Sequence, residues 1–273
     1  MPGRRVGILA IGLLLAGLRT VEASSIVYGI QATTGTIVTV NPVTGAIVNS
    51  YATPAAIAAT DGNAGLTYAA PLDQLLYFNQ SVSNTLYRLD PDTGALLGTA
   101  VGDSFANSGL SYEQSGGQDF LYYAHQNVDV HRQTGFGGGA GFFWATGEPS
   151  QGLGGDGYGR EFGIFNDGQI HEYNPFVDTN AFINGFAAPA GAVGLAFDGS
   201  QLYVSTSQGL LLTLNANTGA VLNSVAVAGG NLIELGANAN GIVAAVPEPA
   251  SLLLLGSGLV GAAVRRRKSR GRL

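Results

Sequence analysis

Short apolar runs of four to seven residues recur along the middle of the chain, separated by turn residues. One stretch shows the pattern in full: Gly65-Leu-Thr-Tyr68, Gln74-Leu-Leu-Tyr-Phe78, Leu86-Tyr-Arg-Leu-Asp90 and Ala95-Leu-Leu-Gly-Thr-Ala-Val101. Runs of this length, rich in Leu, Tyr and Val and bounded by Asn, Asp, Gly and Pro, are typical of strands. The stretch therefore predicts four antiparallel strands, joined by tight turns, in one unit of the repeat, and a full unit takes roughly 44 residues.

The segment between the third and fourth of these strands repeats along the chain. It reads Asn41-Pro-Val-Thr-Gly45 in the first copy, Asp90-Pro-Asp-Thr-Gly94 in the second and Asn215-Ala-Asn-Thr-Gly219 in a later one. Weaker copies are His131-Arg-Gln-Thr-Gly135 and Asn174-Pro-Phe-Val-Asp-Thr179. Aligned on the threonine, the copies fall at positions 44, 93, 134, 179 and 218. Spacings of about 40 to 50 residues are in the range of propeller blades.

Each copy has the chemistry of a hairpin turn. Asn or Asp begins the turn, because its side chain can bind the backbone amides that follow it. The Thr-Gly pair ends it, with glycine supplying a positive φ. The upstream half repeats as well, since Gly109-Leu-Ser-Tyr112 and Gly194-Leu-Ala-Phe197 match Gly65-Leu-Thr-Tyr68. Each unit therefore predicts one four-stranded propeller blade.

Together the units predict an all-β fold over residues 24–246, a β-propeller of about five four-stranded blades. Four or six blades stay open as alternatives, because the third and fourth units merge across Gly135 to Gly159. The first unit lacks the Gly-Leu-x-Tyr half before Ile26. We expect the segment from Gly230 to Ile242 to supply the missing strand and to close the ring.

The N-terminus has the parts of a secretory signal peptide, residues 1–23. The basic pair Arg4-Arg5 precedes an apolar run of 13 residues, Val6 to Leu18. Small residues three positions and one position before the junction predict cleavage between Ala23 and Ser24. A membrane-spanning helix needs about 20 residues, so an uncleaved signal anchor is the less favoured alternative.

The C-terminus, residues 247–273, has a matching order of features. Pro247, Glu248 and Pro249 interrupt any helix from upstream, because proline removes a backbone donor and fixes φ. An uncharged apolar run of 15 residues, 250–264, predicts a transmembrane helix of about 22 Å, short of the about 30 Å of a hydrocarbon core. The basic cluster that follows predicts retention of the tail in the cytoplasm. This cluster comprises Arg265, Arg266, Arg267 and Lys268.

The order of tripeptide, short hydrophobic segment and terminal arginine cluster over residues 246–270 resembles the PEP-CTERM sorting domain. The N-terminal signal peptide predicts Sec-type export and cleavage by signal peptidase. The resemblance implies processing by an exosortase, a membrane protease and transpeptidase. It also implies a transient inner-membrane anchor, then release to the cell surface or extracellular matrix, in bacteria that make exopolysaccharide. A plain C-terminal anchor that is never cut is the alternative. Either way, the resemblance concerns sorting and leaves the task of residues 24–246 open.

The distribution of charge narrows the choice of partners. Between residues 24 and 246 the only basic residues are Arg88, Arg132 and Arg160, against sixteen acids. The formal net charge of this body is therefore −13, whereas that of the whole chain is −6. An acidic body repels phosphate backbones, and we expect no nucleic-acid partner. The acids are spread along the sequence and are predicted to serve solubility. The chain has no cysteine, so its stability must come from core packing.

The glycine-rich stretch from Gly135 to Gly159 holds the only tryptophan. Four aromatics in it are candidates to face a ligand, because aromatic planes beside polar groups suit sugar rings. They are Phe142, Phe143, Trp144 and Tyr158. A flexible loop between blades, or strand residues that face the core, are the alternatives.

Signatures of common enzyme classes are absent from the sequence. It contains no Gly-x-Ser-x-Gly, no Gly-x-x-x-x-Gly-Lys and no His-Glu-x-x-His. His125, His131 and His171 would have to converge from separate strands to bind a metal, and their spacing does not predict this. Asp61-Gly-Asn63 and Asp90-Pro-Asp92 resemble pieces of calcium loops but lack the acidic ligand that follows. We therefore expect no catalytic residue, no metal and no cofactor.

Two main function classes follow. The leading one is an exported, non-enzymatic structural or binding protein of the cell envelope or exopolysaccharide matrix, with exopolysaccharide as its candidate ligand. The alternative is a periplasmic propeller enzyme, lactonase-like or quinoprotein-like, which rests on analogy at the level of fold. A protein-protein scaffold is a third class, because propeller faces tolerate loop variation.

Overall fold

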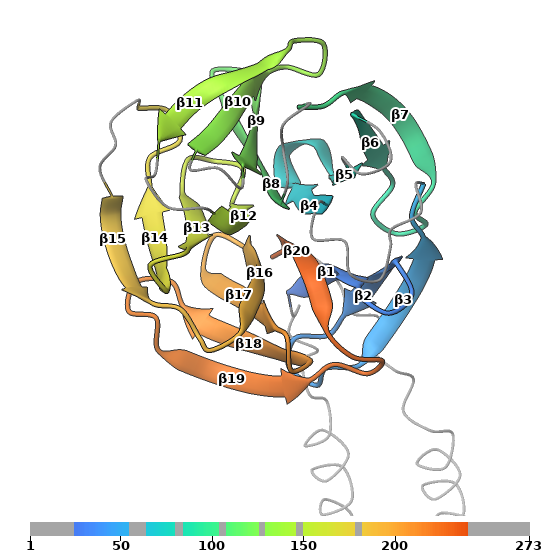
Figure 1. Cartoon of the computed structure of the whole chain (residues 1–273). Coiled ribbons are helices and arrows are strands. Elements are labelled where there is room, and N and C mark those ends of the chain that lie inside the picture. The colour runs from blue at the N-terminus through green and yellow to red at the C-terminus, as the bar shows by residue number, and fades with distance from the viewer. Residues whose placement is uncertain are drawn as a thin grey trace, which may run out of the picture. The chain divides into compact units, whose positions relative to one another are not determined.

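The computed structural model describes residues 25–54, 64–79, 84–103, 108–125, 129–145, 150–177 and 182–239. Within these ranges the chain forms twenty β-strands and one short 3₁₀ helix, η1 (Ala70–Leu72). The strands make five four-stranded sheets, which Figure 1 shows as the blades of a ring. The fold is therefore the predicted all-β propeller, and it has five blades.

The strands of each blade are antiparallel and follow one another from the centre of the ring to its outside. Blade 1 consists of β20 (Leu232–Asn238), β1 (Ile26–Gln31), β2 (Thr36–Val40) and β3 (Ile47–Ala52). Blade 2 consists of β4 (Ala64–Ala69), β5 (Gln74–Asn79), β6 (Thr85–Leu89) and β7 (Leu96–Val101). Blade 3 consists of β8 (Ser108–Ser115), β9 (Gln118–His125), β10 (Asp129–Thr134) and β11 (Ala140–Ala145). Blade 4 consists of β12 (Ser150–Gly155), β13 (Glu161–Phe165), β14 (Gln169–Tyr173) and β15 (Phe182–Ala187). Blade 5 consists of β16 (Ala192–Phe197), β17 (Gln201–Thr206), β18 (Leu210–Asn215) and β19 (Val221–Ala226).

The inner strands β4, β8, β12, β16 and β20 surround the centre of the ring, and each packs against the next (Figure 1). Close packing there requires glycine. A Cβ on Gly109 in β8 would lie 2.9 Å from the backbone nitrogen of Leu153 in β12, and one on Gly65 in β4 would lie 2.6 Å from the Cβ of Leu110. The repeated Gly-Leu pairs are thus the points at which neighbouring blades meet.

The last strand of the body closes the ring as predicted. β20 pairs with β1, with Val27 opposite Ala237 and Gly29 opposite Leu235. The first and last strands therefore share one sheet, and backbone hydrogen bonds join the two ends of the body. Residues Ser24–Ile242 form one compact unit, which is held closed without any disulfide.

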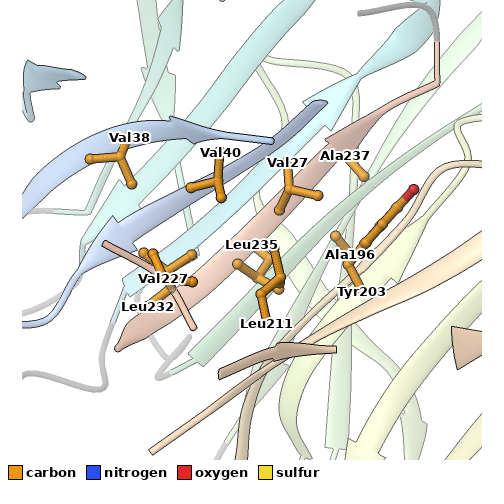
Figure 2. Close-up of a cluster of buried hydrophobic side chains, with 10 residues drawn as sticks. All are labelled: Val27, Val38, Val40, Ala196, Tyr203, Leu211, Val227, Leu232, Leu235 and Ala237. Carbon is orange, nitrogen blue, oxygen red and sulfur yellow. The ribbon is translucent and has the colours of Figure 1, made fainter. Parts of the chain in front are cut away.

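Apolar side chains fill the spaces between the blades. Figure 2 shows the cluster between blades 1 and 5, where Val27 and Val40 lie near Leu235, with Leu211 and Tyr203 on the other side. Similar clusters lie between blades 4 and 5 and between blades 2 and 3. The cluster between blades 3 and 4 is more polar, because two tyrosines there, Tyr122 and Tyr173, lie near the buried acid Glu161.

The repeated turns form as their sequence predicts. In blade 2, the Asp90 carboxylate accepts hydrogen bonds from the backbone amides of Asp92 (3.1 Å) and Thr93 (2.8 Å). Asn41 and Asn215 bind their own turns in the same way. These bonds satisfy amides that the hairpin leaves unpaired.

The same turns also hold neighbouring blades together. Gly94 has a φ of +69° and lies against the ring of Tyr51 in β3, where any Cβ would overlap that ring. The Asn49 side chain of β3 donates to the backbone carbonyl of Asp92, at 2.7 Å. The glycine of the repeat therefore has two tasks, a positive φ and a close contact with the preceding blade.

The glycine-rich stretch from residue 135 to 159 is not simply a loop between blades. It contains β11 and β12, and residues 146–149 between them lie outside the described part. Glycine occurs in β12 because a Cβ on Gly152 would lie 3.2 Å from the backbone nitrogen of Leu195, and one on Gly154 would lie 2.8 Å from the Cα of Ala196. The loop interpretation is wrong for these two strands.

The predicted signal peptide, residues 1–23, and the C-terminal segment, residues 247–273, lie outside the described residues. Within the residues that the structure describes, no helix has the length and apolar character needed to span a bilayer.

Candidate functional site

A buried polar cluster lies between blades 3 and 4. Ser111 and Glu113 come from β8, Glu161 begins β13, and Tyr173 ends β14. Glu161 lies opposite Gly155 on one side and Tyr173 on the other. The side chains of Glu113 and Glu161 are both fully buried, which is unusual for acids and requires hydrogen-bond partners.

Hydrogen bonds from both blades hold the two carboxyl groups. The Ser111 hydroxyl donates to Glu161 Oε1 across the blade boundary, and Tyr173 lies opposite Glu161 on the neighbouring strand. The backbone amide of Gly159 donates to Glu113 Oε2, at 2.5 Å. The other oxygen of Glu113 occupies the place that a side chain on residue 155 would fill, so the cluster requires glycine there.

Burial changes the acid-base character of both groups. Desolvation, and then repulsion from Glu161, raises the pKa of Glu113 to about 10. Desolvation raises the pKa of Glu161 to about 8, although the Ser111 hydroxyl and the neighbouring Tyr173 hydroxyl act against this shift. Both groups therefore favour the protonated form at neutral pH, in which a carboxyl can donate as well as accept.

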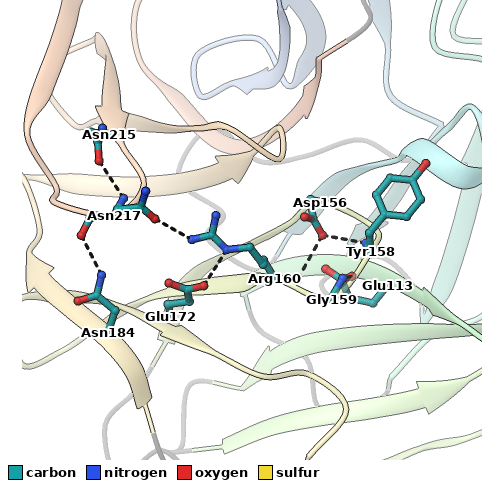
Figure 3. A network of polar contacts seen from close by, with 9 residues as sticks. All are labelled: Glu113, Asp156, Tyr158, Gly159, Arg160, Glu172, Asn184, Asn215 and Asn217. Atoms are coloured by element: carbon teal, nitrogen blue, oxygen red, sulfur yellow. Dashed lines mark hydrogen bonds and ion pairs between the residues drawn. The ribbon is translucent and has the colours of Figure 1, made fainter.

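A short loop between β12 and β13, residues 156–160, connects this cluster with the surface. The Asp156 carboxylate accepts hydrogen bonds from the backbone amides of Tyr158 (2.8 Å) and Arg160 (3.2 Å). Figure 3 shows these contacts, with Glu113 beside Gly159. The Tyr158 side chain is 70% exposed, so it offers an aromatic surface to solvent next to the buried acids.

Arg160 links the same loop to blade 5 (Figure 3). Its guanidinium donates to Glu172 Oε1 at 2.8 Å and to Asn217 Oδ1 at 3.2 Å. The hydrogen bond to Glu172 is the main cause of the raised pKa of Arg160. Asn184 donates to the backbone carbonyl of Asn217, at 2.9 Å. These contacts fix the turn of blade 5 against blade 4, which is a positioning task.

A third buried acid lies at the centre of the ring. Glu234 in β20 precedes Leu235, whereas Gly65, Gly109 and Gly194 precede the equivalent leucines of other inner strands. Its side chain accepts a hydrogen bond from the backbone amide of Gly109 in blade 3. Burial raises its pKa well above the ordinary value. Glu234 thus joins two blades that are not neighbours in the ring.

The four predicted ligand-facing aromatics occupy different surroundings. Phe142 is exposed on the outer strand β11, whereas Phe143 is buried, with its ring edge-on to Tyr122 at 5.4 Å between centroids. The side chain of Trp144 lies outside the described part. Tyr158 belongs to the loop after β12, the inner strand of blade 4, whereas Phe142 lies on the outer strand of blade 3.

The two histidines whose side chains are described lie in different blades, each beside its own carboxylate. His131 Nδ1 lies 2.5 Å from Asp103, and this hydrogen bond is the main cause of its raised pKa. His171 Nε2 lies 2.8 Å from Asp167, and its ring stacks on Phe182. Over the described ranges, no three His, Asp or Glu side chains gather as a metal would require. The side chain of His125 lies outside those ranges.

Sequence reasoning missed the buried acids. It assigned the acids of the body to solubility, which is wrong for Glu113, Glu161 and Glu234. Burial depends on contacts between blades, and no spacing in the sequence marks these three among sixteen acids. A partial signal exists at Glu234, because it takes the place of glycine in the Gly-Leu pattern.

Comparison with known protein families identifies the C-terminal segment. Residues 245–268 match the PEP-CTERM protein-sorting motif. The match covers Pro247, Glu248 and Pro249 and the basic cluster from Arg265 to Lys268. It thus confirms the predicted sorting motif, and it implies export and processing by an exosortase. The cleavage site at Ala23 and Ser24 stays a prediction.

Comparison with curated protein sequences finds no match. Among solved structures, the body is similar to glutaminyl cyclase of Myxococcus xanthus, with 14% identity, a TM-score of 0.43, and coverage of 61% of this chain and 72% of that one. It is also similar to a structure described as BBS1N in complex with ARL6DN, with 12% identity, a TM-score of 0.41, and coverage of 77% and 67%.

Proposed function

We propose that the protein is a non-enzymatic structural or binding module of the cell envelope or exopolysaccharide matrix, exported and sorted through its PEP-CTERM motif. The observation that carries the proposal is the combination of this motif at residues 245–268 with a self-contained propeller before it. Because β20 and β1 close the ring within residues 24–242, we expect the body to keep its fold when the segment after residue 242 is removed, which suits a body that is released by processing.

The proposed export and C-terminal processing can be tested by measuring the mass of the mature protein. We expect chains from the membrane fraction to begin at Ser24 and to retain the C-terminal segment. Chains from the cell surface or medium should end near Pro247, with or without an attached group. Replacing Pro247 and Pro249 by alanine should leave the export step intact and retain the protein in the membrane fraction. Surface chains with an intact C-terminus would contradict the proposed processing.

Binding of exopolysaccharide is the finer part of the proposal, and Tyr158 is its candidate contact. An exposed aromatic ring on a loop that Asp156 holds by hydrogen bonds offers a stacking surface for a sugar ring. A pull-down of the body with the exopolysaccharide of the producing bacterium should retain the wild type. Tyr158→Ala should weaken retention about tenfold, whereas Phe142→Ala, an equally exposed aromatic on another blade, should not. Equal retention of both variants would exclude Tyr158 as the contact.

A periplasmic propeller enzyme is the second candidate, and one observation favours it. Glu113 and Glu161 are two adjacent acids with raised pKa values beneath a surface loop, which is a feature of acid-base sites as well as of structural ones. Hydrolysis of simple lactones by the purified body, lost in Glu161→Gln while the fold is retained, would support this candidate. Hydrolysis that survives the substitution would place any activity elsewhere.

A further inference from the structure

Four of the five outer strands carry a β-bulge at the same place. In β3, β7, β15 and β19 the second residue has no partner on the neighbouring strand, because the register skips it. The bulged residues are Val48, Leu97, Ile183 and Leu222. All are aliphatic, and their side chains are 46%, 52%, 62% and 55% exposed. We call these four residues the apolar rim.

The fold explains the bulges but not their aliphatic side chains. In three strands the bulge is followed by an asparagine, Asn49, Asn184 or Asn223, that bonds the turn of the next blade. A polar residue at the bulge would serve this contact equally well, because the bulged side chain is exposed to solvent. Exposed apolar residues also precede three of the bulges, at Leu96, Phe182 and Val221. Apolar residues exposed at the same position in four blades form a regular pattern, unlike the singly scattered apolar residues that are ordinary on protein surfaces.

The rim lies at one end of the ring, which we call the turn end. Each outer strand begins there, directly after the turn that joins it to the third strand of its blade. The inner strands run toward the same end, so β20 ends there and β1 begins there. Ser25, before β1, bonds Asp198 in the turn between β16 and β17, at 2.7 Å. The chain therefore enters and leaves the body at the turn end.

The length of chain beyond the body limits what can cover this end. The last described residue is Ala239, and the apolar run of the sorting segment begins at Ala250. Eleven residues reach at most about 40 Å when fully extended. While the segment is anchored in a membrane, the turn end thus stays within about 40 Å of the bilayer.

We propose that the apolar rim docks on the headgroup region of the phospholipid bilayer in which the chain is anchored. The proposal rests on the anchor stage of the proposed function. Four like side chains at the same height in four blades match a flat apolar surface, whereas a compact partner would meet one or two blades. Asp90, Asp92 and Asp198 also lie at the turn end, so zwitterionic lipid is the favoured surface and anionic lipid is disfavoured.

The absence of cysteine from the sequence allows a direct test. A single cysteine at Leu222→Cys or Ile183→Cys, in the full chain, takes an environment-sensitive fluorophore. Matched controls are Val101→Cys and Leu210→Cys, which are 65% and 36% exposed at the opposite end of their strands. The labelled chains are reconstituted in vesicles of phosphatidylcholine that contains brominated lipid. We expect bromine to quench rim probes at least about threefold more strongly than control probes, because interfacial groups insert about 5–10 Å. Added anionic lipid should reduce the difference.

Flotation of the vesicles distinguishes a failure of docking from a failure of the membrane anchor. Chains that float with the vesicles but show equal quenching at rim and control positions overturn the docking surface and leave the proposed anchor intact. Chains that do not float overturn both. Sedimentation of the body, residues 24–246, tests a second copy as the occupant. An oligomer that dissociates when Leu97, Ile183 and Leu222 are replaced by serine would assign the rim to self-association and overturn docking on lipid.

Discussion

At the scale of single residues, burial determines what the carboxyl groups of this body can do. Glu113 and Glu161 have pKa values raised to about 10 and about 8 in the folded protein. An unfolded chain releases these protons near pH 4.5. Between about pH 4.5 and pH 8 the folded state thus binds more protons than the unfolded state, and stability falls as pH rises.

Because the raised pKa of Glu161 makes stability fall as pH rises, the substitution Glu161→Gln should reduce this dependence on pH. The wild-type body should lose thermal stability between pH 5 and pH 8, and the variant should lose less, so that its Tm at pH 8 is a few degrees higher. Glutamine keeps an acceptor for Ser111. The measurement is thermal unfolding followed by circular dichroism across that range. Asp92→Asn, which removes one charge from an exposed turn residue, is the control. Identical pH profiles for the two variants would contradict the buried-acid interpretation.

At the scale of elements, the turn between the third and fourth strands is the most clearly repeated part of each blade. Its Asx residue binds the local amides, and its glycine lies against the outer strand of the preceding blade. A local motif thus also makes a contact between blades. This dual role accounts for the recurrence of Thr-Gly where the surrounding strands differ.

The two tasks of the turn glycine can be separated by experiment. Gly94→Ala should destabilise the body by about 2–4 kcal/mol, because it adds overlap with Tyr51 to the strain of a positive φ. Gly116→Ala should cost only about 1–2 kcal/mol, since residue 116 has a φ of +58° but nothing within 4 Å of an added Cβ. Urea unfolding measures both values. Equal losses would show that contact with the neighbouring blade contributes little.

At the scale of the whole molecule, stability depends on closure of the ring. β20 supplies the inner strand of blade 1, and it packs against β4 and β16 on its two sides. A four-stranded blade without its inner strand leaves two neighbouring blades with exposed apolar surface. The fold should therefore be cooperative around the ring.

Truncation tests closure directly. A chain ending at residue 242 should fold like the full body, whereas a chain ending at residue 230 should lose cooperative unfolding, because blade 1 then lacks β20. Leu235→Ala is a milder variant, expected to cost about 2–5 kcal/mol, since Leu235 is buried in the cluster of Figure 2. Near-UV circular dichroism and thermal unfolding report the result. A well-folded chain ending at residue 230 would show that four blades suffice.

The sequence by itself determined the strands, the turns, the repeat, the closing strand and the sorting segment. These features are local, because an Asx-x-x-Thr-Gly turn or a Gly-Leu pair can be recognised from a few consecutive residues. The first unit lacks the Gly-Leu-x-Tyr half before Ile26, and this absence predicted that the segment from Gly230 to Ile242 supplies the inner strand of blade 1.

Only the tertiary structure decided which side chains are buried and which are exposed. Phe142 and Phe143 are neighbours in sequence, yet one faces solvent and the other packs on Tyr122. Glu113 and Glu161 are far apart in sequence and meet between blades, and the apolar rim exists because four bulges coincide in space. Burial is set by contacts between blades. These contacts join residues that are far apart in the sequence, so no local sequence pattern predicts them.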